Sequence, residues 1–159
     1  MKSTLFLAAA LALGLSACAT KSTFVDAGTT PAGTREIDLT GGDTMKYNIT
    51  LVEARPGEPL RLVLSNVGNV PKDVMGHNFV LLRKGTDIAA FAQKAANDKA
   101  SNYLPASVMD QVIVSIKQLG PHESAAVDFN APTEPGTYDY LCTFPGHYMI
   151  GMRGELVVK

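Results

Sequence analysis

The stretch Cys142-Thr-Phe-Pro-Gly-His147-Tyr-Met-Ile-Gly-Met152 decides how this chain folds and what it can bind. It spaces a thiol, an imidazole and a thioether five residues apart around a Pro-Gly turn. Two histidines and one cysteine with a weak axial methionine form the ligand set of a mononuclear copper site that transfers electrons. The stretch therefore predicts such a site, with one histidine still to be supplied from elsewhere.

The second histidine is expected to be His77. The chain contains only three histidines. His122 lies in Gly-Pro-His-Glu, which indicates an exposed turn. His77 lies in Met-Gly-His-Asn-Phe, which indicates a loop that enters a strand. A lone histidine in an apolar stretch is more often a core residue, but the scarcity of histidines here favours a ligand.

Four further residues are predicted to complete the site. We expect Met152 to be the axial ligand in preference to Met149, which follows the imidazole by only two residues and would point away. The Gly76 carbonyl is expected near the metal on the side opposite the thioether. The Phe144 N–H is expected to point at the thiolate, where a hydrogen bond tunes the reduction potential. Asn78 is expected to brace the ligand loop.

The first residues have the features of an export signal. An apolar run over residues 5–15 is too short to span a bilayer, which needs about 20 residues. It ends in Leu15-Ser-Ala-Cys18, which resembles a bacterial lipobox. We expect a signal peptide over residues 1–17 and lipid attachment at Cys18. The alternative is an ordinary secretory leader that leaves a free thiol. The predicted location is the bacterial cell envelope, on its periplasmic or outer-membrane face.

Lipidation would leave Cys142 as the only free thiol of the mature chain. A single thiol outside the cytosol is unusual unless it is buried or bound to metal. Residues 18–34 are polar, contain Gly and Pro, and predict a flexible tether, whereas residues 35–159 are expected to form one domain. The net charge of −1 and the lack of a basic run argue against nucleic acid as a partner.

Short alternating runs in the predicted domain indicate an all-β fold of about eight strands. The runs lie at residues 45–51, 60–64, 77–82, 112–116, 124–129, 137–142 and 154–159. Turns rich in Gly and Pro separate them, which is typical of a β-sandwich. Residues 87–99 are rich in alanine and predict one inserted helix, capped by Thr86 or Asp87. We expect this helix to pack on the outside of the sandwich; the alternative is a helix that binds a partner.

Apolar residues are concentrated around His147. Met75, Pro145, Tyr148 and Met149, with Phe144, are predicted to form an apolar patch on which a redox protein docks. The imidazole edge would lie at its centre, where the electron leaves. The alternative is a set of scattered surface residues. We expect a monomer.

Two segments carry a resemblance to a known family. Asn69-Val-Pro-Lys-Asp-Val-Met-Gly-His77-Asn-Phe-Val-Leu and Cys142-Thr-Phe-Pro-Gly-His147 resemble the two ligand segments of azurins. Over residues 43–159 the chain is similar to the cupredoxins, which include azurins and auracyanins. The resemblance implies a Greek-key β-sandwich and a one-electron carrier outside the cytoplasm. It implies strong copper ligands at His77, Cys142 and His147, and weak ones at Met152 and Gly76.

The chain departs from azurins in three ways. Met152 follows the histidine by five residues, as in auracyanins, where azurins have four. No disulfide can form near the first strands, and Asn66 replaces a histidine that is linked to pH.

An enzyme is not expected, because a second copper would need more ligands than the remaining His122 supplies. The alternative to a carrier is a lipoprotein that buffers copper without transferring electrons.

Overall fold

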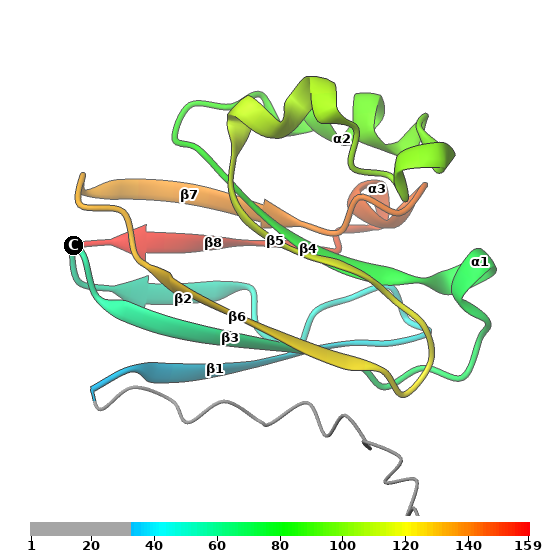
Figure 1. Cartoon of the computed structure of the whole chain (residues 1–159), viewed down its shortest axis with the longest axis horizontal. Helices are drawn as coiled ribbons and strands as arrows, with labels where there is room; N and C mark the ends of the chain where they lie inside the picture. Colours follow the sequence, from blue (N-terminus) through cyan, green and yellow to red (C-terminus); the bar gives the residue numbers. More distant parts are fainter. Residues whose placement is uncertain (1–32) are drawn as a thin grey trace, which may run out of the picture.

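Two β-sheets face each other in the computed structural model, which describes residues 33–159 (Figure 1). The three-stranded sheet has the order β1 (Arg35–Gly41), β3 (Pro59–Asn66), β6 (Ser124–Asn130). The five-stranded sheet has the order β2 (Leu51–Ala54), β8 (Arg153–Val158), β7 (Gly136–Leu141), β4 (His77–Leu82), β5 (Val112–Leu119). The predicted eight-stranded all-β sandwich is confirmed. The predicted signal peptide, Cys18 and nearly all of the tether lie outside the described residues.

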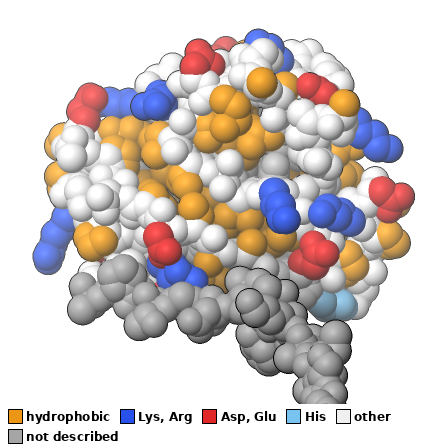
Figure 2. All heavy atoms as spheres, viewed as in Figure 1, with side chains coloured by type: hydrophobic (Ala, Val, Ile, Leu, Met, Phe, Trp, Pro, Cys, Tyr) orange, Lys and Arg blue, Asp and Glu red, His pale blue; other side chains and the backbone are white. Residues whose placement is uncertain are grey.

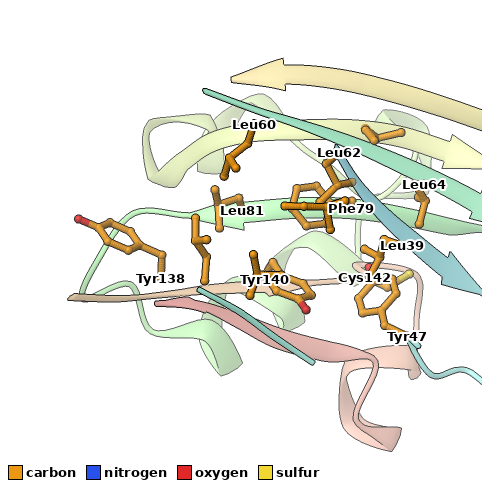
Figure 3. Packing of buried hydrophobic residues seen from close by; sticks show 14 of the residues in the cluster. Leu39, Tyr47, Leu60, Leu62, Leu64, Phe79, Leu81, Tyr138, Tyr140 and Cys142 are labelled. Atoms are coloured by element: carbon orange, nitrogen blue, oxygen red, sulfur yellow. The ribbon is translucent and has the colours of Figure 1, made fainter. Parts of the chain in front are cut away.

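The core lies between the two sheets. Alternate residues of β3, Leu60, Leu62 and Leu64, face Phe79 and Leu81 of β4, as Figure 3 shows. The pattern has the period of two that a strand with one buried face requires. Cys142 is part of the same core, so the predicted thiolate ligand is built into the buried interior between the sheets.

Strand β4 is buried on both faces because a helix covers its outer side. Helix α2 (Ile88–Ala96) packs Phe91 and Ala95 against Val80 and Leu82 of β4. The Asp87 carboxylate accepts the N–H groups of residues 89 and 90, which confirms the predicted N-cap. The helix ends three residues earlier than predicted. Short 3₁₀ turns follow at Lys99–Ser101 and Ala106–Gln111.

The strand predicted at residues 45–51 is wrong in most of its length. Residues 42–50 are irregular, with a single bridge between Gly41 and Tyr47, and β2 begins only at Leu51. Tyr47 is buried as the alternation indicated, but it packs from a loop. The strand that the prediction missed is β1, which has only Ile37 and Leu39 as large apolar residues among charged ones.

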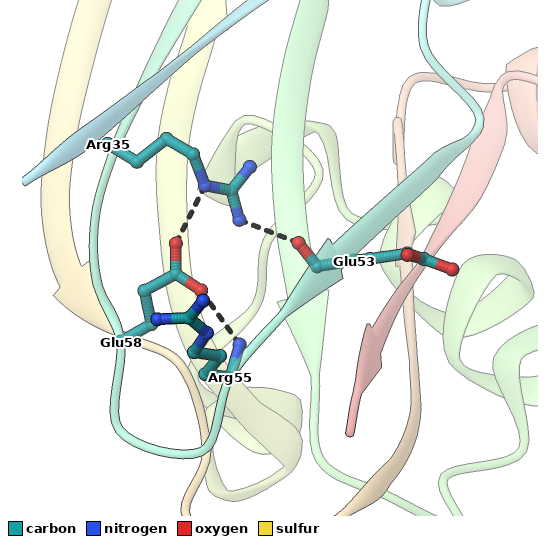
Figure 4. Close-up of polar contacts among 4 residues, drawn as sticks. All are labelled: Arg35, Glu53, Arg55 and Glu58. Atoms are coloured by element: carbon teal, nitrogen blue, oxygen red, sulfur yellow. Dashed lines mark hydrogen bonds and ion pairs between the residues drawn. The ribbon is translucent and has the colours of Figure 1, made fainter.

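Arg35 ties the sheets together at the end of the sandwich where β1 begins (Figure 4). It donates to the Glu53 carbonyl of β2 at 2.6 Å and to the Glu58 carboxylate at 2.7 Å. The exposed ion pair of Arg35 with Glu58 contributes only about 0.2–1 kcal/mol. The effect of the two contacts is to fix the start of β1. Helices α1 (Lys72–Met75) and α3 (His147–Ile150) lie at the other end (Figure 1).

The surface carries charges of both signs without a large patch of either on the face drawn in Figure 2. Hydrophobic side chains form a band across the middle of that face. None of the helices in residues 33–159 is long and apolar enough to cross a membrane.

Candidate metal centre

The three strongest predicted ligands meet at one point. His77 begins β4, Cys142 directly follows β7, and His147 begins α3. The two histidine Nδ1 atoms lie 3.3 Å apart, and the cysteine Sγ lies 3.4 Å from Nδ1 of His147. All three donor atoms lie within 4.8 Å of one another, and all three side chains are buried. It is the only group of this kind within residues 33–159.

Backbone hydrogen bonds close the loop that carries Cys142, His147 and Met152. The Cys142 N–H donates to the Met152 carbonyl at 3.0 Å, and the Met152 N–H donates to the His147 carbonyl at 2.9 Å. Gly146 and Gly151 take left-handed conformations, with φ of 83° and 96°, which glycine adopts without strain. The loop therefore holds its three donors in place through its own backbone.

Asn78 fastens this loop to β4. Its side chain donates to the Thr143 hydroxyl at 2.7 Å and accepts the Thr143 N–H at 2.8 Å. The buried Tyr47 hydroxyl donates to the Asn78 carbonyl at 2.5 Å. These bonds join the strand of the first histidine to the residue beside the cysteine. Sequence reasoning missed Tyr47, because nothing in its local sequence points to the metal centre.

Burial keeps all three donors electrically neutral near pH 7. It raises the pKa of Cys142 to about 11, although the backbone N–H groups of Asn78 and Phe144 act in the opposite direction. Burial, and then the neighbouring His77, lower the pKa of His147 to about 4. Burial also lowers the pKa of His77, against the effects of the Gly42 carbonyl and the Asp43 carboxylate. A bound cation would displace the thiol proton.

The arrangement fits one transition-metal ion. Bonds of about 2.0–2.3 Å from a metal to nitrogen and sulfur place three trigonal donors roughly 3.5 Å apart. The two shortest separations here, 3.3 and 3.4 Å, are close to that value. Nε2 of His77 is buried without a hydrogen-bond partner. The His77 ring also packs against the His147 ring, at 5.0 Å between centroids.

The two predicted weak ligands flank the same region. Met152 is fully buried, whereas its rival Met149 is 83% exposed and so cannot reach a buried ion from its present position. Gly76 is buried directly before His77, and a side chain there would collide with Gln118. The ligand roles of Met152 and the Gly76 carbonyl stay predictions.

The predicted patch is only partly exposed. Pro145 and Met149 are exposed, and Met75 and Tyr148 are half-buried. The His147 imidazole, predicted at the centre of the patch, is 1% exposed and packs on the Phe144 ring at 4.6 Å between centroids.

Sequence reasoning missed two exposed residues at this end, Val74 of α1 and Ile150 of α3. Val74 adjoins Met75 and Ile150 adjoins Met149, which the predicted patch included, but the prediction did not extend to them. His122 is exposed in its turn and is not part of the group of three donors.

Comparisons with known proteins agree with this geometry. A family model described as copper-binding proteins of the plastocyanin/azurin family matches residues 34–159. Auracyanin-B of Chloroflexus aurantiacus is 35% identical over 81% of this chain, and the match covers 53% of auracyanin-B, about half its length. Azurin of Pseudomonas aeruginosa is 32% identical over 77% of this chain and 84% of azurin. Auracyanin A of Chloroflexus aurantiacus, described as a "blue" copper protein, superposes with a TM-score of 0.69 at 31% identity, covering 80% of this chain and 100% of that one.

Proposed function

The chain belongs to the plastocyanin/azurin family of copper-binding proteins, and on this premise we propose that it carries single electrons outside the cytoplasm. The family confirms copper as the predicted cofactor, and His77, Cys142 and His147 are positioned to bind one ion. The observation that carries the proposal is this meeting of three buried donors from two distant parts of the chain.

The construction of the site favours electron transfer over catalysis on a substrate. Catalytic metal sites keep an open position for water or substrate, whereas the three donors here are buried in or beside the hydrophobic core. Bound copper would supply the Cu(II)/Cu(I) couple. The hydrogen bonds from Asn78 and Tyr47 hold the loop and β4 in one geometry, which limits rearrangement when the charge changes.

We assign the weak ligands to Met152 and the Gly76 carbonyl. The main chain of Met152 is hydrogen-bonded to the main chains of Cys142 and His147, so its Cα atom lies next to the strong ligands. The N–H groups of Phe144 and Asn78, which lower the pKa of the thiol, would also favour the thiolate in the metal-bound protein.

A redox protein would dock on the apolar patch at the α1/α3 end. Pro145 and Met149 are its exposed members, and Met75 and Tyr148 extend it. Exposed Val74 and Ile150 lie at the same end and widen the apolar surface. A small apolar contact suits a monomeric carrier that must release its partner after each transfer.

The proposed location is the cell envelope, with residues 35–159 as a cupredoxin domain joined by residues 18–34 to a lipid on Cys18. This part of the proposal rests on the Leu15-Ser-Ala-Cys18 segment.

Copper titration of the soluble domain tests the function. Cu(II) should give an intense blue or green colour, a narrow copper hyperfine splitting in EPR, and a reversible one-electron wave in voltammetry. Cys142→Ser should abolish the colour, whereas His122→Gln, a control at an exposed histidine, should keep it. A colourless complex would contradict the copper assignment. A coloured complex without a reversible wave would favour the copper-buffering alternative.

A further inference from the structure

The segment that begins with the last residue of strand β1, Gly41–Lys46, lies against the loop that carries Met152. We call this segment the β1 bend. Gly41 is the last residue of β1, and a Cβ atom built on it would lie 2.5 Å from the terminal methyl carbon of Met152. The same atom would lie 3.4 Å from two carbons of the His77 ring. The bare backbone of Gly41 is therefore in direct contact with one proposed weak ligand and one strong ligand.

The other end of the β1 bend holds the same loop by a charged hydrogen bond. The Lys46 ammonium donates to the Ile150 carbonyl, across 104 residues of sequence. The nitrogen also lies 2.7 Å from where a Cβ of Gly151 would be. Gly151 is the left-handed residue directly before Met152. Lys46 thus holds the main chain at residues 150 and 151, directly before the residue that carries the thioether.

We propose that the β1 bend positions the axial thioether, with Gly41 setting how closely the Met152 side chain can approach and Lys46 setting the path of its loop. The inference rests on the proposed role of Met152 as a weak copper ligand. Neither residue touches the metal donors of Cys142 or His147 in the observed contacts, so both are positioning residues.

A side chain at position 41 would have to displace either the Gly41 backbone or the Met152 side chain. Real Cβ atoms do not approach a carbon to 2.5 Å, so something must move. The backbone of Gly41 is fixed by its pairing with Asn66 and by the Val67 N–H, which donates to its carbonyl at 2.8 Å. The Met152 methyl is the free end of an unbranched side chain with several rotatable bonds. The thioether is therefore the part that moves.

Gly41→Ala is the first test, with Gly120→Ala as its matched control. A Cβ on Gly120 would meet Lys72 at 3.3 Å and Glu123 at 3.5 Å and none of the ligands. We expect Gly41→Ala to shift the thiolate-to-copper absorption bands and the reduction potential, because the axial ligand tunes both. The control should shift neither. In metal-free protein with ¹³C-methyl methionine, the Met152 methyl signal should move in Gly41→Ala alone.

Lys46→Met is the second test and does not depend on Gly41→Ala folding well, because Lys46 is a surface residue. It should shift the potential and the Met152 methyl signal, and Lys46→Arg should restore both. Lys117→Met removes the same charge from an exposed position of β5 and should leave both unchanged.

Met152→Leu separates the possible outcomes. If it leaves the absorption bands and the potential unchanged, Met152 is not a ligand and the proposed weak-ligand assignment is wrong. If it changes them while Gly41→Ala and Lys46→Met match their controls, the positioning role of the β1 bend is overturned and the ligand assignment stands.

Discussion

Burial of the ligands makes the stability of the metal-free domain depend on pH. The pKa of His147 is lowered from 6.5 to about 4, and that of His77 is also lowered. Between pH 6.5 and 4 the unfolded chain therefore binds protons that the folded domain does not bind. Stability must fall as the pH drops through this range, by up to about 1.4 kcal/mol per pH unit for each proton. The pKa of Cys142 is raised from 9.0 to about 11, so stability must also fall as the pH rises through that interval.

Urea unfolding of the metal-free domain at a series of pH values measures this dependence. Compared with wild type, His147→Gln should lose less stability between pH 6.5 and 4, and Cys142→Ser should lose less between pH 9 and 11. His122→Gln, at an exposed site, should follow wild type throughout. A wild-type curve with the same acid slope as His147→Gln would contradict the assigned pKa direction.

Single residues were predictable from sequence where the chemistry is local. Cys142, His147 and Met152 lie in one stretch, and His77 was found because only three histidines exist. The contacts of Gly41, Tyr47 and Lys46 were not predictable. Each depends on a partner 31 or more residues away, and nothing in the local sequence marks any of the three as part of a metal site.

At the level of elements, a single side chain caps the N-terminus of helix α2. The Asp87 carboxylate accepts two of the N–H groups that a helix start leaves unpaired, each at 3.0 Å. Asp87→Ala should lower the free energy of unfolding by about 1 kcal/mol, within the usual range of 0.5–2. Asp87→Ser should keep most of the stability, because its hydroxyl can accept the same bonds. Equilibrium denaturation of the three proteins measures the difference, and equal stability of wild type and Asp87→Ala would contradict the role of the cap.

The strands show what alternation can and cannot predict. Met45, Tyr47 and Ile49 do turn inward, at least in part, but an irregular loop crossing the end of the sandwich supports the same alternation as a strand. The phase then changes by one residue, so that Leu51 is exposed and Val52 buried. Strand β1 was not predicted, because its two large apolar residues lie among charged ones and show no clear alternation. The strand is stabilised by pairing with β3, about 25 residues later, which the local sequence does not reveal.

At the scale of the whole molecule, the predicted lipid on Cys18 decides where the protein resides. Cys18→Ser should move the full-length chain from the membrane fraction to the soluble fraction, because the acyl chains provide the attachment. Cys142→Ser removes the other cysteine of the chain and should leave the protein in the membrane fraction. Fractionation and immunoblotting measure both. A Cys18→Ser protein that stays with the membranes would contradict lipidation at this residue.

Strand β1 begins and ends at opposite ends of the sandwich. The strand begins at Arg35, at the end of the sandwich where the C-terminus also lies, and finishes at Gly41 against Met152 (Figure 1). Seven residues at about 3.3 Å each separate those two poles by roughly 20 Å. The proposed anchor before Arg35 would therefore join the domain at the pole remote from the proposed copper site, and would leave the proposed docking patch at the other pole free to meet partners.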